Sequence, residues 1–261
     1  MRSLAGAFLA LLTACAAPAT GSPTFDTAHI GGPSDFGAVA RLYRPRSDEP
    51  APAMVVLHGC AGIGAHEQQW GQRLADWGYV ALLVDSFAPR GVANVCSHGQ
   101  TIPPLLRAAD AYAAAAWLRT QPYVRADRIG VIGFSHGGWT VMRAVLESTV
   151  QSDHAVPFKA AVAFYPGCPP SPSPLATDTL ILIGDADDWT PYEPCVRFQQ
   201  NLVGNGHTLA MKIYPGALHS FDSELPSRLY MGHHLGHDPV ASADAIAATR
   251  EFLAARLRGA S

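Results

Sequence analysis

Continuous apolar runs recur along the chain, and segments with helical spacing separate most of them. Such runs are typical of strands buried on both faces, because a half-exposed strand alternates apolar and polar side chains. The predicted strands lie at 53–58, 79–84, 128–133, 159–165, 179–183 and 209–214, and the alternating segment 38–43 is expected to be an edge strand. The predicted helices lie at 67–77, 104–120, 137–147, 192–203 and 242–257. This alternation favours a mostly parallel central sheet with helices on both faces.

Composition narrows the classes of function. The 261 residues are 48% hydrophobic and 15% charged, which suits one sizeable core and argues against a disordered chain. The net charge is −3 and no Lys/Arg-rich run occurs, so charge-driven nucleic-acid binding is not expected. No apolar stretch reaches 18 residues, so no ordinary transmembrane helix is expected. The sequence shows no repeat, and we expect one α/β domain over 35–261.

The N-terminus has the features of an export signal. A short positive region and the apolar residues 4–12 precede a Leu-Thr-Ala-Cys sequence that ends at Cys15 and resembles a bacterial lipobox. We therefore predict a lipoprotein-type signal peptide over 1–14, lipidation of Cys15, a flexible tether over 15–34, and a periplasmic or cell-envelope location. Ordinary cleavage near Ala14–Ala17 and a cytoplasmic protein are the alternatives.

Four cysteines remain without Cys15, and an even number in an oxidising compartment permits two disulfides. Cys168 and Cys195 follow neighbouring predicted strands at the same end of the sheet, so we expect these two to pair. That pairing leaves Cys60 with Cys96. Four buried free thiols are the alternative. No C-x-x-C spacing occurs, so neither a zinc site nor a redox motif is indicated.

A G-x-S-x-G sequence marks the predicted nucleophile. Gly133-Phe134-Ser135-His136-Gly137 lies between a buried strand and a helix, which is the context that makes this motif informative. The glycines permit a tight reversal that lifts the Ser135 hydroxyl above the sheet and points the helix N-terminus at it. A simple glycine turn is the alternative.

A serine hydroxyl is a poor nucleophile without a base, and after such a turn an acid and then a histidine follow along the chain. His219 lies on a loop after the last predicted strand and is the predicted base. Three aspartates, Asp185, Asp187 and Asp188, follow the strand at 179–183 and are candidates for the acid. Each of them could instead be a solvated loop carboxylate.

These segments resemble the α/β-hydrolase superfamily and, within it, the dienelactone hydrolase family, over about residues 35–258. The residues that carry the resemblance are His58-Gly59-Cys60-Ala61-Gly62, Asp85-Ser86-Phe87, Gly133 to Gly138, Gly184-Asp185-Ala186-Asp187 with Pro191, and His219-Ser220-Phe221. The resemblance implies a single α/β-hydrolase domain that cleaves a carboxylic ester, lactone or thioester of a small molecule without cofactor or metal. Dienelactone hydrolases carry Cys where this chain has Ser135, so dienelactone itself is not implied as the substrate.

The resemblance also implies site residues. In this superfamily the acid commonly stands three residues after the glycine and four before the proline, which implies Asp187, with Asp188 and then Asp185 as alternatives. The oxyanion hole needs two backbone N–H donors. One is His136, which follows the nucleophile, and the resemblance implies Cys60 as the other, with Ala61 as the alternative.

Three further side chains could bind substrate. Arg90 could hold a substrate carboxylate in a bidentate contact, or it could pair with Asp85. Phe134 and Trp189 lie beside the predicted nucleophile and acid, where they could line an acyl pocket or belong to the core.

Three histidines, His233, His234 and His237, lie close together near the end of the chain. They could suggest a metal, but Gly and Pro surround them, and we expect a loop that covers the catalytic histidine. The sequence as a whole predicts an exported serine hydrolase that uses Ser135, Asp187 and His219 through an acyl-enzyme. An inactive binding protein of the same fold and a peptidase are the alternatives.

Overall fold

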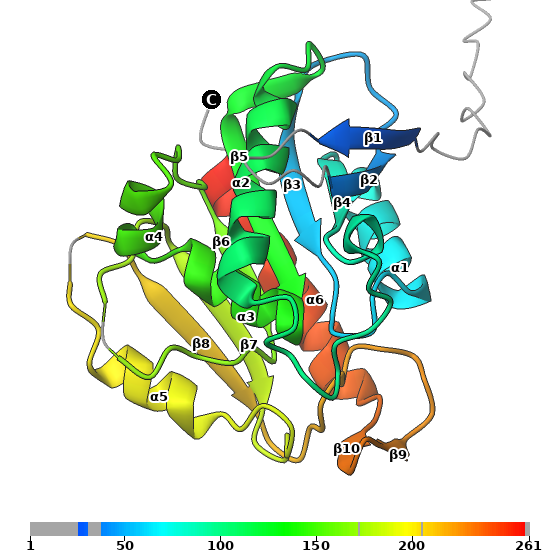
Figure 1. Cartoon of the computed structure of the whole chain (residues 1–261), viewed down its shortest axis with the longest axis vertical. Coiled ribbons are helices and arrows are strands. Elements are labelled where there is room, and N and C mark those ends of the chain that lie inside the picture. The colour runs from blue at the N-terminus through cyan, green and yellow to red at the C-terminus, as the bar shows by residue number, and fades with distance from the viewer. Residues whose placement is uncertain (1–25, 31–37, 172, 205, 259–261) are drawn as a thin grey trace, which may run out of the picture.

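The computed structural model describes residues 26–30, 38–171, 173–204 and 206–258 (Figure 1). Its central sheet has eight strands in the order β1-β2-β4-β3-β5-β6-β7-β8. The strands are β1 (Asp26–Ile30), β2 (Ala38–Tyr43), β3 (Ala51–Leu57), β4 (Val80–Asp85), β5 (Val124–Phe134), β6 (Ala161–Phe164), β7 (Thr179–Gly184) and β8 (Leu209–Tyr214). Strand β2 runs antiparallel to both β1 and β4, and all other neighbours in the sheet are parallel.

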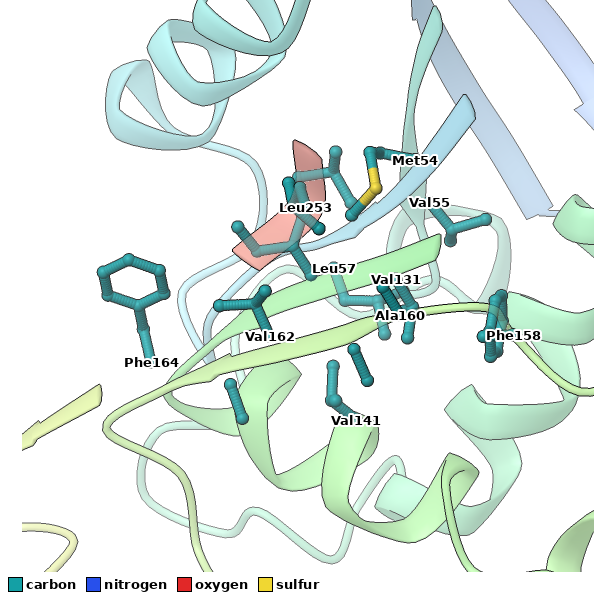
Figure 2. Close-up of a cluster of buried hydrophobic side chains, with 14 of the residues drawn as sticks. Met54, Val55, Leu57, Val131, Val141, Phe158, Ala160, Val162, Phe164 and Leu253 are labelled. Atoms are coloured by element: carbon teal, nitrogen blue, oxygen red, sulfur yellow. The ribbon is translucent and has the colours of Figure 1, made fainter. Parts of the chain in front are cut away.

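Helices cover both faces of this sheet. The helices are α1 (Ala65–Asp76), α2 (Pro104–Arg119), α3 (His136–Ala144), α4 (Glu147–Ser152), α5 (Glu193–Gln200) and α6 (Pro239–Leu253), with a 3-10 turn at Ala88–Arg90 and a π-helical turn at Ala254–Arg258. The β3-α1-β4 and β5-α3-β6 crossovers run in opposite directions across the sheet, so right-handed connections place α1 and α3 on opposite faces. Figure 2 shows Leu253 of α6 on one side of the strands and Val141 of α3 on the other.

The core lies between these layers. Every residue of β3, β6 and β7 is buried, as the continuous apolar runs predict for strands with helices on both faces. Trp70 of α1 lies against Phe134 and Phe164, with ring centroids 5.4 and 5.1 Å apart, so α1 is anchored over the ends of β5 and β6. The predicted fold class is therefore confirmed.

Two predicted segments differ from the structure. The helix predicted at 137–147 ends at Ala144, because Leu146 leaves the helix and forms a β-bridge with Leu175 before α4 begins. Asp26–Ile30, which falls in the predicted tether, is a strand that pairs with β2. The predicted signal peptide and Cys15 lie outside the described residues. Within the described ranges, no helix is long and apolar enough to cross a membrane.

The predicted cover loop is a small hairpin. Its strands are β9 (Arg228–Tyr230) and β10 (His233–Leu235), which run antiparallel and form a separate sheet. Met231 and Gly232 join the two strands, and both have positive φ angles of 55° and 87°. This is the backbone of a type I′ turn, which matches the twist of a hairpin. A β-bridge between Leu235 and His219 places the hairpin beside the predicted base.

Both predicted disulfides are present. Cys60 is bonded to Cys96, and Cys168 is bonded to Cys195, with Cα atoms 4.8 and 5.0 Å apart. Cys60 follows β3, Cys168 follows β6, and Cys195 lies in α5 after β7. The two bonds therefore brace the loops at the carboxyl edge of the sheet, where parallel α/β folds place their ligands.

Candidate active site

The turn between β5 and α3 holds Ser135 in a strained backbone conformation, with φ 53° and ψ −115°. Neighbouring backbone leaves no room for a side chain on either side of it. A Cβ atom on Gly133 would lie 2.3 Å from the Gly137 oxygen, and one on Gly137 would lie 2.2 Å from the Leu57 oxygen. The glycines of the motif are thus required by close approach, and strain of this kind clusters at functional sites.

The ring of His219 lies between the side chains of Ser135 and Asp187. His219 Nε2 is 2.9 Å from Ser135 Oγ, and His219 Nδ1 is 2.8 Å from Asp187 Oδ2. The side chains of His219 and Asp187 are almost fully buried, at 2% and 0% exposure. An imidazole held in this way can accept the hydroxyl proton, while the carboxylate fixes its tautomer and stabilises the resulting cation.

Hydrogen bonds from its own loop orient the Asp187 carboxylate. The backbone N–H groups of Trp189 and Thr190 donate to Asp187 Oδ1, each over 2.9 Å. The Thr190 hydroxyl donates to Asp187 Oδ2, also over 2.9 Å. These bonds hold the carboxylate in position for its contact with His219 Nδ1, so the loop sets the approach of the acid to the ring.

The other two candidate acids bind elsewhere. Asp188 is exposed and accepts hydrogen bonds from the backbone N–H of His234 and from its Nδ1, over 3.0 and 2.8 Å. Hydrogen bonding from His234 lowers the pKa of Asp188 below its usual value. Asp185 accepts from the Gly216 N–H over 2.6 Å. Of the three aspartates, Asp187 is the one that contacts His219.

The turn after β3, with Cys60 in it, is fixed by a buried carboxylate that the sequence analysis did not identify. Glu67 accepts hydrogen bonds from the N–H groups of Gly59 and Gly64, over 3.3 and 2.8 Å. Burial alone would raise the pKa of Glu67, but hydrogen bonding from His66 and its charge lower it to about 2. The Glu67 carboxylate and the Cys60–Cys96 disulfide together hold the turn beside Ser135.

A buried arginine on α2 joins the same turn to α3. Arg107 donates to His136 Nδ1 over 2.7 Å and to the carbonyl oxygen of His58 over 2.8 Å. His136 Nε2 in turn donates to the Gly99 oxygen over 2.7 Å. Burial and the Arg107 charge lower the pKa of His136 to about 4, so its ring is neutral and accepts from Arg107. The sequence signal for Arg107 is a cation near the start of an Ala/Leu-rich helical stretch.

A second buried network, also missed from the sequence, lies behind the turn. Asp222 accepts hydrogen bonds from His66 Nε2, Trp70 Nε1 and the Tyr165 hydroxyl, over 2.9, 2.9 and 2.8 Å. Burial alone would lower the pKa of His66, but the Asp222 charge and hydrogen bond raise it to about 10. His66 is therefore a cation at neutral pH. The one sequence signal is that Asp222 stands three residues after His219.

Two cavities meet at Ser135. The α1-side cavity has a volume of about 400 Å³, and the α3-side cavity has a volume of about 540 Å³. Both are lined by Cys60, Cys96, Ser135 and Trp189. The α1-side cavity adds Ala65, His66, His219, Ser223, Leu225 and Tyr230, among others. The α3-side cavity adds His136, Trp139, Arg143, Cys168, Pro170 and Thr190, among others.

The predicted substrate-binding side chains have different positions. Arg90 does not line either cavity, because it donates to both carboxylate oxygens of Asp110, over 2.7 and 2.8 Å. The structure therefore pairs Arg90 with Asp110 of α2, and its contact with a substrate carboxylate stays a prediction. Phe134 lines the α1-side cavity and also packs in the core. Trp189 lies over the His219 ring, with centroids 5.1 Å apart.

The three clustered histidines do not form a metal-binding site in the part of the chain that the structure describes. His233 stacks on Trp189 with ring centroids 4.8 Å apart, and His234 binds Asp188. Among the residues that the structure describes, no group of three His, Cys, Asp or Glu side chains could hold a metal ion. The hairpin instead contacts the loop that carries Asp187 through His233 and His234.

The chain is similar to known proteins in sequence and in structure. A model of the Dienelactone hydrolase family matches residues 39–257. A relative from Bradyrhizobium sp, named as a probable 2-oxo-3-(5-oxofuran-2-ylidene)propanoate lactonase, is 26% identical over 203 residues, which are 73% of this chain and 81% of the relative. A solved dienelactone hydrolase-like promiscuous phosphotriesterase from metagenomic libraries is 22% identical, with a TM-score of 0.74 over 90% of this chain and 98% of that chain. A solved esterase of Thermogutta terrifontis with bound propionate is 20% identical, with a TM-score of 0.67 over 89% and 94%.

The His66–Asp222 pair predicts a pH-dependent stability. Because His66 binds its proton more tightly in the folded protein, its contribution is complete below its ordinary pKa of 6.5 and is lost as the pH rises toward about 10. The unfolding free energy of the wild type is therefore expected to fall over this range more steeply than that of His66→Gln. Urea denaturation at several pH values measures this difference, with the exposed His207→Gln as the matched control. Equal slopes for wild type and His66→Gln would contradict the assignment of a charged His66.

Proposed function

Because the chain belongs to the dienelactone hydrolase family, we propose that it is a serine hydrolase that cleaves carboxylic ester bonds with Ser135, His219 and Asp187. The observation that carries this proposal is the position of the His219 ring, 2.9 Å from Ser135 Oγ on one side and 2.8 Å from Asp187 Oδ2 on the other. These distances lie within the range that proton transfer between a nucleophile and its base requires.

Acylation begins when Ser135 Oγ attacks the ester carbonyl carbon and His219 Nε2 accepts the hydroxyl proton. Asp187 stabilises the imidazolium that forms. The carbonyl oxygen becomes an oxyanion, which the backbone N–H groups of His136 and Cys60 stabilise together with the N-terminus of α3. His219 then donates its proton to the alkyl oxygen, the carbon–oxygen bond breaks, and the alcohol leaves an acyl-Ser135 ester.

Deacylation uses the same groups with water in place of Ser135. His219 accepts a proton from water, and the hydroxide attacks the acyl carbon. The oxyanion again lies against His136 and Cys60. The acid product leaves as His219 returns the proton to Ser135 Oγ. All of these steps use groups of the chain itself.

The related proteins support a small carboxylic ester or lactone as the substrate. The Bradyrhizobium relative is named as a lactonase, and the Thermogutta terrifontis esterase holds propionate. In this chain, apolar side chains dominate the α1-side cavity beside Ser135, among them Phe134, Leu225 and Tyr230. Such a lining suits the carbon chains of a neutral ester.

The two disulfides indicate an oxidising, extracytoplasmic compartment. We propose that the mature protein begins at Cys15 and carries a lipid anchor there, which the lipobox-like sequence supports. Mass spectrometry of the N-terminal peptide from the membrane fraction of the native host is expected to give an acylated Cys15. A chain that begins at Met1 would contradict export, and cleavage at Ala16 or beyond would contradict lipidation alone.

Replacing the nucleophile tests the proposed function. Ser135→Ala is expected to lower kcat for activated esters by roughly 10⁶-fold, because loss of a triad nucleophile typically has this effect. Thermal unfolding is expected to be nearly unchanged, since alanine retains the backbone and removes one hydroxyl. Ser223→Ala is the matched control, because Ser223 is a serine that lines the same cavity and its backbone N–H binds the Ser220 oxygen. Equal rates for the two variants would remove Ser135 from this role.

The acid is tested by a pair of neighbouring substitutions. Asp187→Asn is expected to lower kcat by about 10³- to 10⁴-fold, because an amide at this position favours the wrong histidine tautomer. Asp188→Asn weakens the contacts of this carboxylate with His233 and His234, which lie outside the reacting atoms, so a loss below about tenfold is expected. Ester hydrolysis by the two purified variants decides between the aspartates, and a larger loss in Asp188→Asn would overturn the choice of Asp187.

A further inference from the structure

Ser135 is shared by two cavities at the carboxyl edge of the sheet, one beside the start of α1 and the other beside α3. Ala65 and His66, at the start of α1, line the α1-side cavity, whereas Trp139 of α3 lines the α3-side cavity. Because α1 and α3 cover opposite faces, the two cavities diverge from the nucleophile. A substrate whose carbonyl carbon lies at Ser135 can therefore direct one substituent into each.

The position of His219 distinguishes the two cavities. His219 lines the α1-side cavity and does not line the α3-side cavity. In acylation the alkyl oxygen must reach His219 Nε2 to receive a proton, so the alcohol portion of an ester lies on the side of His219. The acyl chain takes the remaining direction from the carbonyl carbon.

Resting on the proposed function, we propose that the α1-side cavity binds the alcohol portion of the substrate and the α3-side cavity binds the acyl portion, so that the preferred substrates are open-chain esters with a sizeable group on both sides. Volumes of about 400 and 540 Å³ lie in the range of cavities that hold small-molecule ligands. The single methyl group of an acetate or of a methyl ester is far too small to fill either cavity.

Ring size follows from the same geometry. In an open-chain ester the acyl and alkyl chains extend in opposite directions from the ester group. A small-ring lactone ties these two chains together on one side of the group, so it can fill only one of two diverging cavities. The chain is therefore expected to prefer open-chain esters to five-membered lactones. The Cys60–Cys96 disulfide lines both cavities, whereas Cys168 of the other disulfide lines the α3-side cavity.

The test narrows each cavity at an exposed lining residue. Pro170→Trp fills the α3-side cavity, and Leu225→Trp fills the α1-side cavity. Both residues are exposed, so neither change disturbs the core, and thermal unfolding checks this. The substrates are methyl acetate, benzyl acetate, methyl hexanoate and benzyl hexanoate, which combine a small or large acyl group with a small or large alcohol. Each kcat/KM is divided by that of methyl acetate on the same variant.

Pro170→Trp is expected to lower the relative kcat/KM of both hexanoates by about tenfold or more, since loss of a hydrophobic subsite has effects of this size. Leu225→Trp is expected to do the same to both benzyl esters. The wild type is expected to hydrolyse benzyl hexanoate more efficiently than γ-butyrolactone. If Pro170→Trp instead lowers the rates of the benzyl esters and Leu225→Trp those of the hexanoates, the assignment of the two cavities is wrong. A preference of the wild type for γ-butyrolactone also overturns the assignment. Neither result bears on the proposed function. Ester hydrolysis that survives in Ser135→Ala overturns the proposed function and this assignment with it.

Discussion

The close approach of two turns at the carboxyl edge of the sheet governs the site. Gly137 lies against the backbone of Leu57, so the turn that carries Ser135 and the turn that follows β3 share one surface. Any side chain at Gly137 would separate them, and the N–H groups proposed for the oxyanion hole lie one in each turn. Ser135, with a positive φ of 53°, lies at the point where the chain leaves β5 and begins α3.

Buried charges around the site hold backbone in place. Glu67 binds two N–H groups of the turn after β3, and Arg107 ties the carbonyl of His58 to the ring of His136. Behind the α1-side cavity, Asp222 accepts hydrogen bonds from His66, from the Trp70 indole and from the Tyr165 hydroxyl. Each of these groups is buried and has hydrogen-bonded partners, as buried charges must be. They keep the turns fixed while the proposed chemistry moves a proton between Ser135 and His219.

The sequence predicts the strands and the turn around Ser135, but it does not predict the buried polar side chains that hold the turns in place. Apolar runs and the turn around Ser135 predict the strands, because burial on both faces leaves a local pattern. Asp222 and His66 are 156 positions apart, and Arg107 is 29 positions from His136, so no local pattern shows that they meet. Arg90 illustrates the converse, since its place after a strand suggests a ligand contact but both of its terminal nitrogens donate to Asp110 of α2. Such pairings depend on how helices pack, which spacing along the chain does not encode.

Covalent labelling is the most direct test of Ser135 as the nucleophile, because it reports which hydroxyl the fold activates. The purified protein is treated with a fluorophosphonate, digested, and sequenced by mass spectrometry. We expect a single phosphonylated peptide, with the modification on Ser135 and blocked by prior incubation with an ester substrate. Modification of Ser86 or Ser223 in place of Ser135, or ester hydrolysis that continues in fully labelled protein, would contradict it.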